Sequence, residues 1–319
     1  MHYGWGLLFG WCVSGLLHAQ NYPQNYPQKG VRLVIPFTAG GAADIIGRLL
    51  AAELSQNLGQ AVVVDNRGGG GTVIGTEMVA RASPDGYSLG LITPSFTVNG
   101  AIRRLPFDSI NDFAPIALVG ITPLILVTHP SLPVHTVTDL IRLAGQHPGE
   151  LVYASAGPGS PTHMGMELLR FSGIRMTHIP YKGAAPALVD LVGGHVQLMQ
   201  TSIIIAKPYM SSMRLRPIAV TTAQRAKNLP QVPSIAETIP GYEVLNWWGV
   251  VAPAKTPPAV VTRLNTEIRQ VMNRASSKEK LSVEGAESAN GSPVEFEQML
   301  KKEISQWRRL GESIQLKLD

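Results

Sequence analysis

Two glycine-containing turns carry the residue types that can bind an anion without a charged side chain. The first, residues 37–44, follows an apolar segment at 31–37 and leads into apolar residues spaced by three and four. The second, residues 155–163, repeats this order. Where a strand ends, bends on glycines and opens a helix, several backbone N–H groups lack intrahelical partners, and the helix dipole favours negative charge. Both turns therefore indicate sites for a small anion.

The two turns face the same cleft if each lies at the carboxyl end of its strand. The alternative is that the glycines only make tight strand-to-helix turns. The binding interpretation predicts ligand contacts from the two turns and from the ends of two further strands. The predicted set is Phe37, Thr38, Ala39, Ala42, Thr93, Ser95, Ser155, Gly157, Thr162, His163, Gln200 and Thr201.

Other chemistries fit the sequence less well. His163 and Glu167 lie four residues apart on one predicted helix and could share a metal ion, but no third ligand of suitable spacing is evident. Residues 68–71 are four glycines without the Lys-Ser/Thr of a P-loop. Residues 157–161 do not match the Gly-x-Ser-x-Gly of serine hydrolases. The sequence therefore predicts no catalytic residue, no metal and no cofactor.

A βαβαβ pattern positions the first turn. Strands are predicted at 31–37, 61–65 and 87–93, and all three are apolar throughout rather than alternating. That is typical of parallel strands covered on both faces. Helices are predicted at 42–58, which Gly59 closes, and at 73–82. The pattern predicts a doubly wound parallel sheet.

A second α/β unit, at roughly 125–240, positions the second turn. Residues 95–115 have no clear period, and Thr136 and Asp139 then form a capping box for a helix that ends near 146. The remaining elements follow the same strand–helix order. Strands are predicted at 151–155, 176–181, 195–199 and 215–221, and helices at 162–172 and 184–192.

Two long apolar segments, 116–129 and 242–253, join the units. Helices predicted at 256–273 and 293–310 have no strands of their own to cover, so we expect the chain to return to the first sheet. The predicted architecture is two doubly wound α/β lobes joined by crossings near 120–126 and 244–250. Lobe 1 is discontinuous, with residues 31–122 plus 247–319, and lobe 2 is 123–246.

Composition agrees with two lobes. A chain of 319 residues is long for one core. Charged residues make up 15%, against a norm of roughly 25%, so much of the surface of each element should be covered. The net charge of +5 comes from scattered Lys and Arg with no run of five, which disfavours nucleic acid as a partner.

Residues 1–19 resemble a secretory signal peptide, although the usual basic residues before the apolar core are missing. Residues 7–17 are apolar, and Leu17-His-Ala19 is a suitable cleavage site. The segment is shorter than the about 20 residues a membrane span needs. Residues 20–30 are predicted to be a flexible mature N-terminus. Since the single cysteine, Cys12, lies inside the signal, the mature protein would carry no thiol.

Several short motifs lie in order along the chain. These are Pro36-Phe-x-x-Gly-Gly-x-x-Asp44, Val64-x-Asn-Arg67, Ser83-Pro-Asp-Gly-Tyr87, Ser155-Ala-Gly-x-Gly-Ser160 with Thr162-His163, His178-x-Pro-Tyr-Lys-Gly-Ala-Ala-Pro-Ala-Leu188, Leu229-Pro-x-Val-Pro-Ser234 and Ala252-Pro-Ala-x-Thr-Pro-Pro258. Together they resemble the Bug/TctC solute-binding proteins, from about residue 26 to the C-terminus.

The resemblance implies a type II periplasmic-binding-protein fold. It also implies a periplasmic receptor, not an enzyme, that binds a small organic mono- or dicarboxylate largely through backbone N–H groups. The implied partners are the membrane permease subunits of a tripartite tricarboxylate transporter. An orphan receptor that presents a bound carboxylate to a membrane signalling sensor is the alternative, and an enzyme is the weaker rival.

The chain departs from the family pattern at one predicted wall of the site. Family members commonly show Phe-Asp-Asn after the strand that ends at Met199, whereas this chain has Gln200-Thr-Ser202. Because the family acid is missing, the sequence favours a plain mono- or dicarboxylate over an amino acid with an ammonium group. Thr38-Ala39 also replaces residues that are often Pro-Gly in the family.

Overall fold

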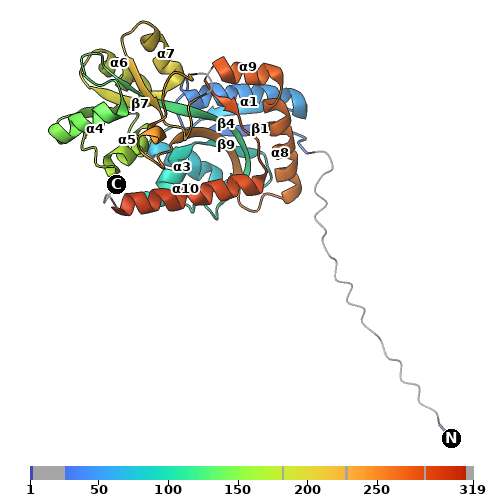
Figure 1. Cartoon of the computed structure of the whole chain (residues 1–319). Helices are drawn as coiled ribbons and strands as arrows, with labels where there is room; N and C mark the ends of the chain where they lie inside the picture. The colour runs from blue at the N-terminus through green and yellow to red at the C-terminus, as the bar shows by residue number, and fades with distance from the viewer. Residues whose placement is uncertain (3–25, 182, 227–228, 284, 314–319) are drawn as a thin grey trace.

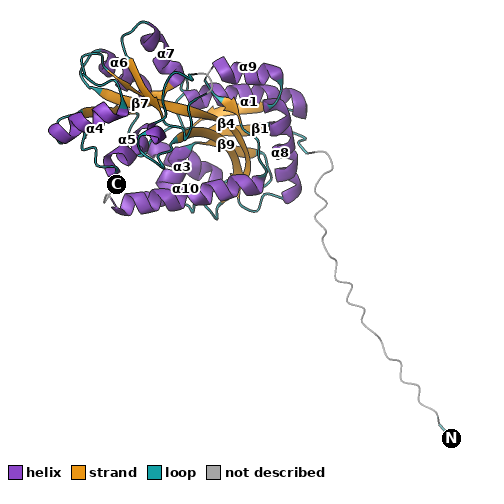
Figure 2. Ribbon diagram, viewed as in Figure 1, coloured by secondary structure: helices purple, strands orange, loops and turns teal. Residues whose placement is uncertain are grey.

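The computed structural model describes residues 1–2, 26–181, 183–226, 229–283 and 285–313 (Figures 1 and 2). The predicted signal peptide, apart from residues 1–2, and residues 20–25 lie outside this part of the chain. The strands of the described residues are β1 (Val31–Ile35), β2 (Val62–Asn66), β3 (Ser88–Ile92), β4 (Phe113–Thr128), β5 (Val152–Ser155), β6 (Thr177–Pro180), β7 (Leu198–Ser202), β8 (Arg216–Val220), β9 (Leu245–Pro253) and β10 (Glu287–Ser288). The α-helices are α1 (Ala42–Leu58), α2 (Val73–Ala80), α3 (Pro94–Ile102), α4 (Val137–Gln146), α5 (Pro161–Phe171), α6 (Ala184–Val192), α7 (Ile203–Ser211), α8 (Pro258–Met272), α9 (Ala275–Val283) and α10 (Pro293–Ser313), and short 3₁₀ turns lie at Gly70–Thr72 and Ile235–Glu237.

The strands form one mixed sheet in the order β2-β1-β3-β9-β4-β7-β5-β6, and β8 and β10 also pair with β4. The long strand β4 belongs to both halves. It pairs with β9 up to Pro123, and with β7 and β8 from Leu124 or Ile125 onward. Figure 1 shows β4 and β9 running through the middle, with α1, α8 and α9 on one side and α4 to α7 on the other.

Helices cover both faces of the first half, as the uniformly apolar strands predicted. In β9, Trp248 and Val250 pack into a cluster with α1 and α8, whereas Trp247 and Val251 pack into one with α10 and Phe96 of α3. Successive strand residues point to opposite faces, so two clusters on alternating positions mean two covered faces. The tryptophan pair therefore forms core on both sides of the sheet.

The second half repeats this arrangement. Leu124 and Leu126 of β4 pack with residues of α4 and α5, and Ile125 and Val127 pack with residues of α6 and α7. The prediction of two doubly wound α/β lobes in a type II binding-protein fold is confirmed. Both predicted crossings lie in strands that pair with each other, β4 and β9. The exact lobe boundaries, 31–122 plus 247–319 and 123–246, stay a prediction.

Local signals placed several helices correctly. α1 begins at Ala42 and ends at Leu58, followed by Gly59 with a left-handed φ of 66°. The Thr136–Asp139 capping box is present at the start of α4, with both reciprocal hydrogen bonds. These caps satisfy backbone groups that a helix end would otherwise leave unpaired.

Three elements differ from the sequence prediction. Residues 95–115 were expected to lack periodic structure, but α3 occupies Pro94–Ile102. The strand predicted at 195–199 begins at Leu198 and continues to Ser202, and α7 follows it directly. The C-terminal region, predicted to have no strand, contains β10, a two-residue strand that pairs with Gly120 and Ile121. No helix in the described part of the chain is long and apolar enough to span a membrane.

Candidate functional site

The strands of the two lobes run in directions that bring their carboxyl ends toward each other. β1 and β3 are parallel, β3 is antiparallel to β9, and β9 is antiparallel to β4, so β1 and β3 point along β4 toward its second half. β7 is antiparallel to β4 and parallel to β5, so β5 and β7 point back toward the first half. Both sets of carboxyl ends therefore converge where β4 changes partner, between Pro123 and Leu124. Open α/β sheets bind ligands at this edge.

The first-lobe loop, Phe37–Ala42, follows β1 and opens α1. Phe37 is half-buried, and Thr38, Ala39 and Ala42 are exposed. Among the described residues, no acceptor is found for the backbone N–H groups of Thr38, Ala39, Gly41 or Ala42. Gly41, the residue before α1, supplies no side-chain cap. The loop therefore presents several unpaired donors at a helix N-terminus, as the anion-site hypothesis requires.

Asp44 fixes the shape of this loop from inside α1. Its carboxylate accepts the Gly40 N–H at 2.9 Å and lies 3.0 Å from Arg48 Nε. Burial alone would raise the pKa of Asp44, but these hydrogen bonds outweigh burial and lower it. Arg67 likewise pairs with Asp65 at 2.8 Å. The cations beside the loop are thus neutralised by acids, which leaves the backbone as its source of positive potential.

The glycine run at 68–71 packs directly against the first-lobe loop. A Cβ on Gly68 would lie 3.1 Å from Thr38 N, and one on Gly75 would lie 2.8 Å from Pro36 Cα. Asn99 of α3 holds the run in place by donating to Gly71 O at 2.7 Å. These glycines therefore act as close-packing residues that support the first-lobe loop.

Thr93 and Ser95 lie at the next strand end, between β3 and α3. Thr93 is the N-cap of α3 but makes no side-chain cap, and both residues are buried. Neither hydroxyl has a hydrogen-bond partner among the described residues. Two unpartnered hydroxyls at the N-terminus of α3 thus lie at the carboxyl edge of the same parallel strands as the first-lobe loop.

The second-lobe loop, Ser155–His163, satisfies its own N–H groups. Ala156 N–H donates to Thr162 Oγ1 at 2.9 Å, Gly157 N–H to Ser155 Oγ at 3.1 Å, and Gly159 N–H to His163 Nδ1 at 3.1 Å. Ser160 caps α5 by accepting the His163 N–H. Ser155, Gly157, Thr162 and His163 are all buried. The strand–glycine–helix order is confirmed here, but the donors are occupied.

Three stacked rings lie behind the second-lobe loop. The His178 ring lies 4.7 Å from that of Tyr153 and 4.2 Å from that of His163, with interplanar angles of 13° and 19°. Tyr153 donates its hydroxyl proton to Glu167 at 2.6 Å, and Arg170 donates to the same carboxylate at 2.9 Å. Burial, with the charges of His178 and Arg170, lowers the pKa of His163 to about 3, so its ring is neutral at physiological pH.

Gln200 and Thr201 are fully buried in β7. Gln200 Nε2 donates to the Tyr242 hydroxyl at 2.6 Å, and this hydroxyl donates to Gly165 O at 3.0 Å. Gln200 Oε1 and Thr201 Oγ1 have no hydrogen-bond partner among the described residues. The amide thus links β7 to α5, and its role as a ligand contact stays a prediction, as it does for the other residues of the predicted set.

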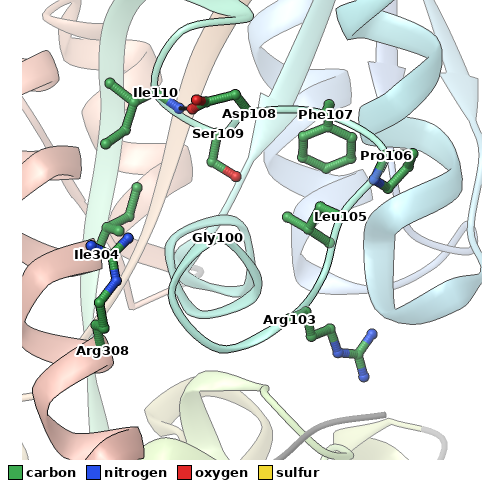
Figure 3. Close-up of a pocket in the computed structure, with 10 residues that line it drawn as sticks. All are labelled: Gly100, Arg103, Leu105, Pro106, Phe107, Asp108, Ser109, Ile110, Ile304 and Arg308. Carbon is green, nitrogen blue, oxygen red and sulfur yellow. Dashed lines mark hydrogen bonds between the residues drawn. The ribbon is translucent and has the colours of Figure 1, made fainter.

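A separate cavity of about 510 Å³ lies beside α3 and α10 (Figure 3). Figure 3 shows Arg308 and Arg103 on either side of the α3 turn that holds Gly100, so their guanidinium groups do not converge. The cavity contains none of the predicted ligand residues. Its lining is Gly100, Arg103, Leu105, Pro106, Phe107, Asp108, Ser109, Ile110, Ile304 and Arg308. Within the described residues, no group of three or more His, Cys, Asp or Glu side chains is placed to hold a metal ion.

The fold and the paired strand ends define a two-lobe α/β binding protein, and comparisons specify the family. Residues 46–316 match the family model described as tripartite tricarboxylate transporter family receptor. The chain belongs to this family. The Bug/TctC resemblance is confirmed: Protein BugT of Bordetella pertussis is 33% identical over 287 residues, which cover 88% of each chain.

Two similar solved structures carry bound acids. R. palustris Rpa4515 with adipate is 39% identical, covers 90% of this chain and 97% of its own, and has a TM-score of 0.82. MatC (Rpa3494) from Rhodopseudomonas palustris with bound malate is 29% identical, covers 89% of this chain and 99% of its own, and has a TM-score of 0.80.

Sequence reasoning missed the residues that support the two loops. Asn99 lies in a helix that the sequence did not predict, and Tyr153 and His178 were part of strands without an assigned role. One signal was available for the ring pair: the predicted parallel strands at 151–155 and 176–181 follow each other along the chain. In the structure Tyr153 and His178 are direct partners in β5 and β6.

Proposed function

We propose that this protein is a periplasmic receptor that binds a small organic mono- or dicarboxylate between its lobes and delivers it to the permease subunits of a tripartite tricarboxylate transporter. The observation that carries the proposal is a row of unpaired N–H groups where the carboxyl ends of the strands of both lobes converge. These groups belong to Thr38, Ala39, Gly41 and Ala42. The role is that of a receptor without catalytic activity.

The chemistry of the first-lobe loop suits a carboxylate. A carboxylate accepts several N–H donors, and a helix N-terminus favours its charge. The unpartnered hydroxyls of Thr93 and Ser95 supply two more donors at the neighbouring strand end. The relatives that hold adipate and malate support this ligand class.

The ligand class can be narrowed to acids without an ammonium group. An ammonium group needs acceptors, preferably a carboxylate, and at the end of β7 this chain has Gln200-Thr-Ser202, with Thr201 at the position of the acid in the family pattern Phe-Asp-Asn. The nearest acid of the first-lobe loop, Asp44, is already paired with Arg48. We therefore propose plain mono- and dicarboxylates as ligands, ahead of amino acids.

Closure of the two lobes over the ligand follows from contacts in both. A ligand that touches both loops favours the conformation in which they are close, so closure is a hinge motion at the β4 and β9 crossings. The predicted lobe boundaries at 122/123 and 246/247 are the positions where we propose this bending.

A thermal-shift screen tests the ligand class. The panel should hold adipate, malate, aspartate and glutamate, with adipamide as a matched control that lacks carboxylates. A bound acid at 100 times its Kd adds about 2.7 kcal/mol to the free energy of unfolding. We expect a clear rise in Tm with adipate or malate and none with adipamide. A rise in Tm with adipamide alone would contradict the proposal. So would the absence of any rise in Tm across a broad panel of acids.

A further inference from the structure

We propose that His163 and His178 are positioning residues, which shape the second-lobe loop through one specific ring nitrogen each and do not contact the ligand. His163 acts through Nδ1, which accepts the Gly159 N–H, and His178 acts through Nε2, which bonds Ser155 Oγ. His163 is buried and His178 is half-buried, and a ligand or metal contact was the obvious alternative role for His163.

The hydrogen bonds determine the tautomer of His163. Because Gly159 N–H donates to Nδ1 at 3.1 Å, that nitrogen carries no proton, and in the neutral ring the proton lies on Nε2. Nε2 lies 3.8 Å from Glu167 Oε1, whose carboxylate also accepts the Tyr153 hydroxyl. The loop backbone therefore bonds one edge of the ring, and a buried acid faces the other edge at a distance too long for a hydrogen bond.

His178 reaches the loop from the neighbouring strand. Its Nε2 lies 2.7 Å from Ser155 Oγ, and the same oxygen accepts the Gly157 N–H at 3.1 Å. Since His178 is stacked between the rings of Tyr153 and His163, neither histidine can turn without disturbing the other. Two side chains therefore fix two amides of one loop, Gly157 and Gly159, whose φ angles of 118° and 74° are left-handed.

Fixing these glycines should raise ligand affinity without a direct contact. Glycines have more conformational freedom than other residues, so a free loop would have to lose that freedom when the lobes close. A loop that is already ordered avoids this cost, and a supported site holds its geometry better than an unsupported one. This effect on affinity rests on the function proposed above.

The two amide side chains distinguish the two nitrogens. In Asn the amide oxygen lies at the distance of Nδ1 from the backbone, and in Gln it lies near the distance of Nε2. We expect His163→Asn to retain the Gly159 hydrogen bond and His163→Gln to lose it. The order reverses at the other ring: His178→Gln retains the bond to Ser155, and His178→Asn loses it. All four variants lose an imidazole, so each pair is its own control.

Amide hydrogen exchange of the ligand-free protein is the first measurement. We expect about tenfold faster exchange at Gly159 in His163→Gln than in His163→Asn, and about tenfold faster exchange at Gly157 in His178→Asn than in His178→Gln. Calorimetric titration with adipate should show the same ranking, with about tenfold weaker binding in the mismatched variants. Equal exchange within each pair, or the reverse ranking, would overturn the proposal.

The wild-type chain supplies a test that does not depend on the variants folding. Imidazole ¹⁵N NMR should show His163 as a neutral ring with its proton on Nε2 throughout pH 5–8. A proton on Nδ1, or titration near the ordinary histidine pKa, would overturn the assignment. If the wild type binds no carboxylate while the exchange and NMR results hold, the proposed function fails and the positioning role stands.

Discussion

The first-lobe and second-lobe loops have the same plan but opposite hydrogen-bonding states. Both follow a parallel strand, bend on glycines and open a helix. The first-lobe loop is exposed, with donors unpaired at Thr38 and Ala39, whereas the second-lobe loop is buried and bonds its own N–H groups. The difference comes from side chains that can accept: Ser160 caps α5, but Gly41 cannot cap α1. A turn signature therefore predicts where donors lie, and neighbouring acceptors decide whether a ligand can use them.

The different hydrogen-bonding states of the two loops predict different roles for the two lobes in ligand binding. A loop with unpaired donors and no internal acceptors gains hydrogen bonds when an anion binds, and so contributes attraction. A loop with paired donors gains few, and contributes a preformed surface against which the ligand is enclosed. Under the function proposed above, we expect the carboxylate to bind first to the first lobe and the second lobe to close over it.

The largest effects are expected from the glycines that support each loop. Gly75→Ala places a Cβ 2.6 Å from Arg67 O and 2.8 Å from Pro36 Cα, and these backbone atoms cannot yield without moving the first-lobe loop. We expect a loss of about 3 kcal/mol in the free energy of unfolding. Gly165→Ala meets Gln200 Oε1 at 2.0 Å, a side-chain atom that can shift, so the loss should be smaller, about 2 kcal/mol.

Urea unfolding measures both losses. Gly145→Ala is the matched control, because Gly145 lies in α4 with no atom within 4 Å of the added Cβ. Alanine is the better helix former, so this variant should gain about 0.5–1 kcal/mol. A Gly75→Ala variant as stable as the wild type would show that α2 does not support the first-lobe loop by close packing.

The second prediction is that a buried acid of the first lobe and a buried histidine of the second make the free energy of unfolding depend on pH in opposite directions. In the first lobe, Glu303 accepts hydrogen bonds from Thr97 at 2.8 Å and Trp247 at 2.9 Å, and burial raises the pKa of its carboxyl to about 7. The folded state therefore binds a proton that the unfolded chain releases, so stability falls as pH rises from about 4.5 to about 7, by up to about 1.4 kcal/mol per pH unit.

For His163 the sign is reversed. Burial lowers the pKa of this ring to about 3, so below about 6.5 the unfolded chain binds a proton that the folded state excludes. Stability therefore falls as pH drops below about 6.5, again by up to about 1.4 kcal/mol per unit. Urea unfolding at pH 5 to 8 should show that Glu303→Gln removes the first dependence and His163→Asn reduces the second. Burial also lowers the pKa of His178, which leaves part of the acid-side dependence in place. Identical pH profiles for Glu303→Gln and the wild type would refute the assignment to Glu303.

The sequence predicted those elements whose signal is local. A few neighbouring residues are enough to recognise capping residues such as Thr136 and Gly59, or a strand that is covered on both faces. α3 did not, because every residue from Pro94 to Asn99 is buried, and a helix covered all round shows no polar period. β10 is too short for any pattern.

For the candidate site, the sequence predicted the position of the loops but not the state of their donors. The acceptor for Gly159 N–H lies in the same segment, but its orientation depends on stacking against His178, fifteen positions further along the chain. Gln200 was placed at the site from its position at a strand end. Its side chain donates to the Tyr242 hydroxyl, which donates to Gly165 O of α5, and the sequence alone could not identify these buried partners.

The smallest change in stability, and the sharpest test of the comparison, comes from giving the first-lobe loop a cap like that of the second. Gly41 has an extended backbone, with φ −86° and ψ 171°, and an added Cβ would lie 4.0 Å from the nearest atom, Thr38 O. Gly41→Ser therefore fits without strain, and its hydroxyl can accept an N–H of the first turn of α1.

Replacing an N-cap glycine by serine should stabilise the protein by a few tenths of a kcal/mol. If the ligand binds at the N-terminus of α1, the same change should weaken adipate binding about threefold, because the hydroxyl places a second acceptor beside the unpaired first-lobe donors and bonds an N–H of the same helical turn. Ser160→Gly is the reciprocal control: it should cost a few tenths of a kcal/mol and leave the first-lobe donors unchanged. Thermal unfolding and calorimetric titration of both variants separate the two effects. A Gly41→Ser protein that is more stable yet binds adipate as tightly as the wild type would place the carboxylate elsewhere, and with it the distinction between the attracting and the enclosing lobe would fail.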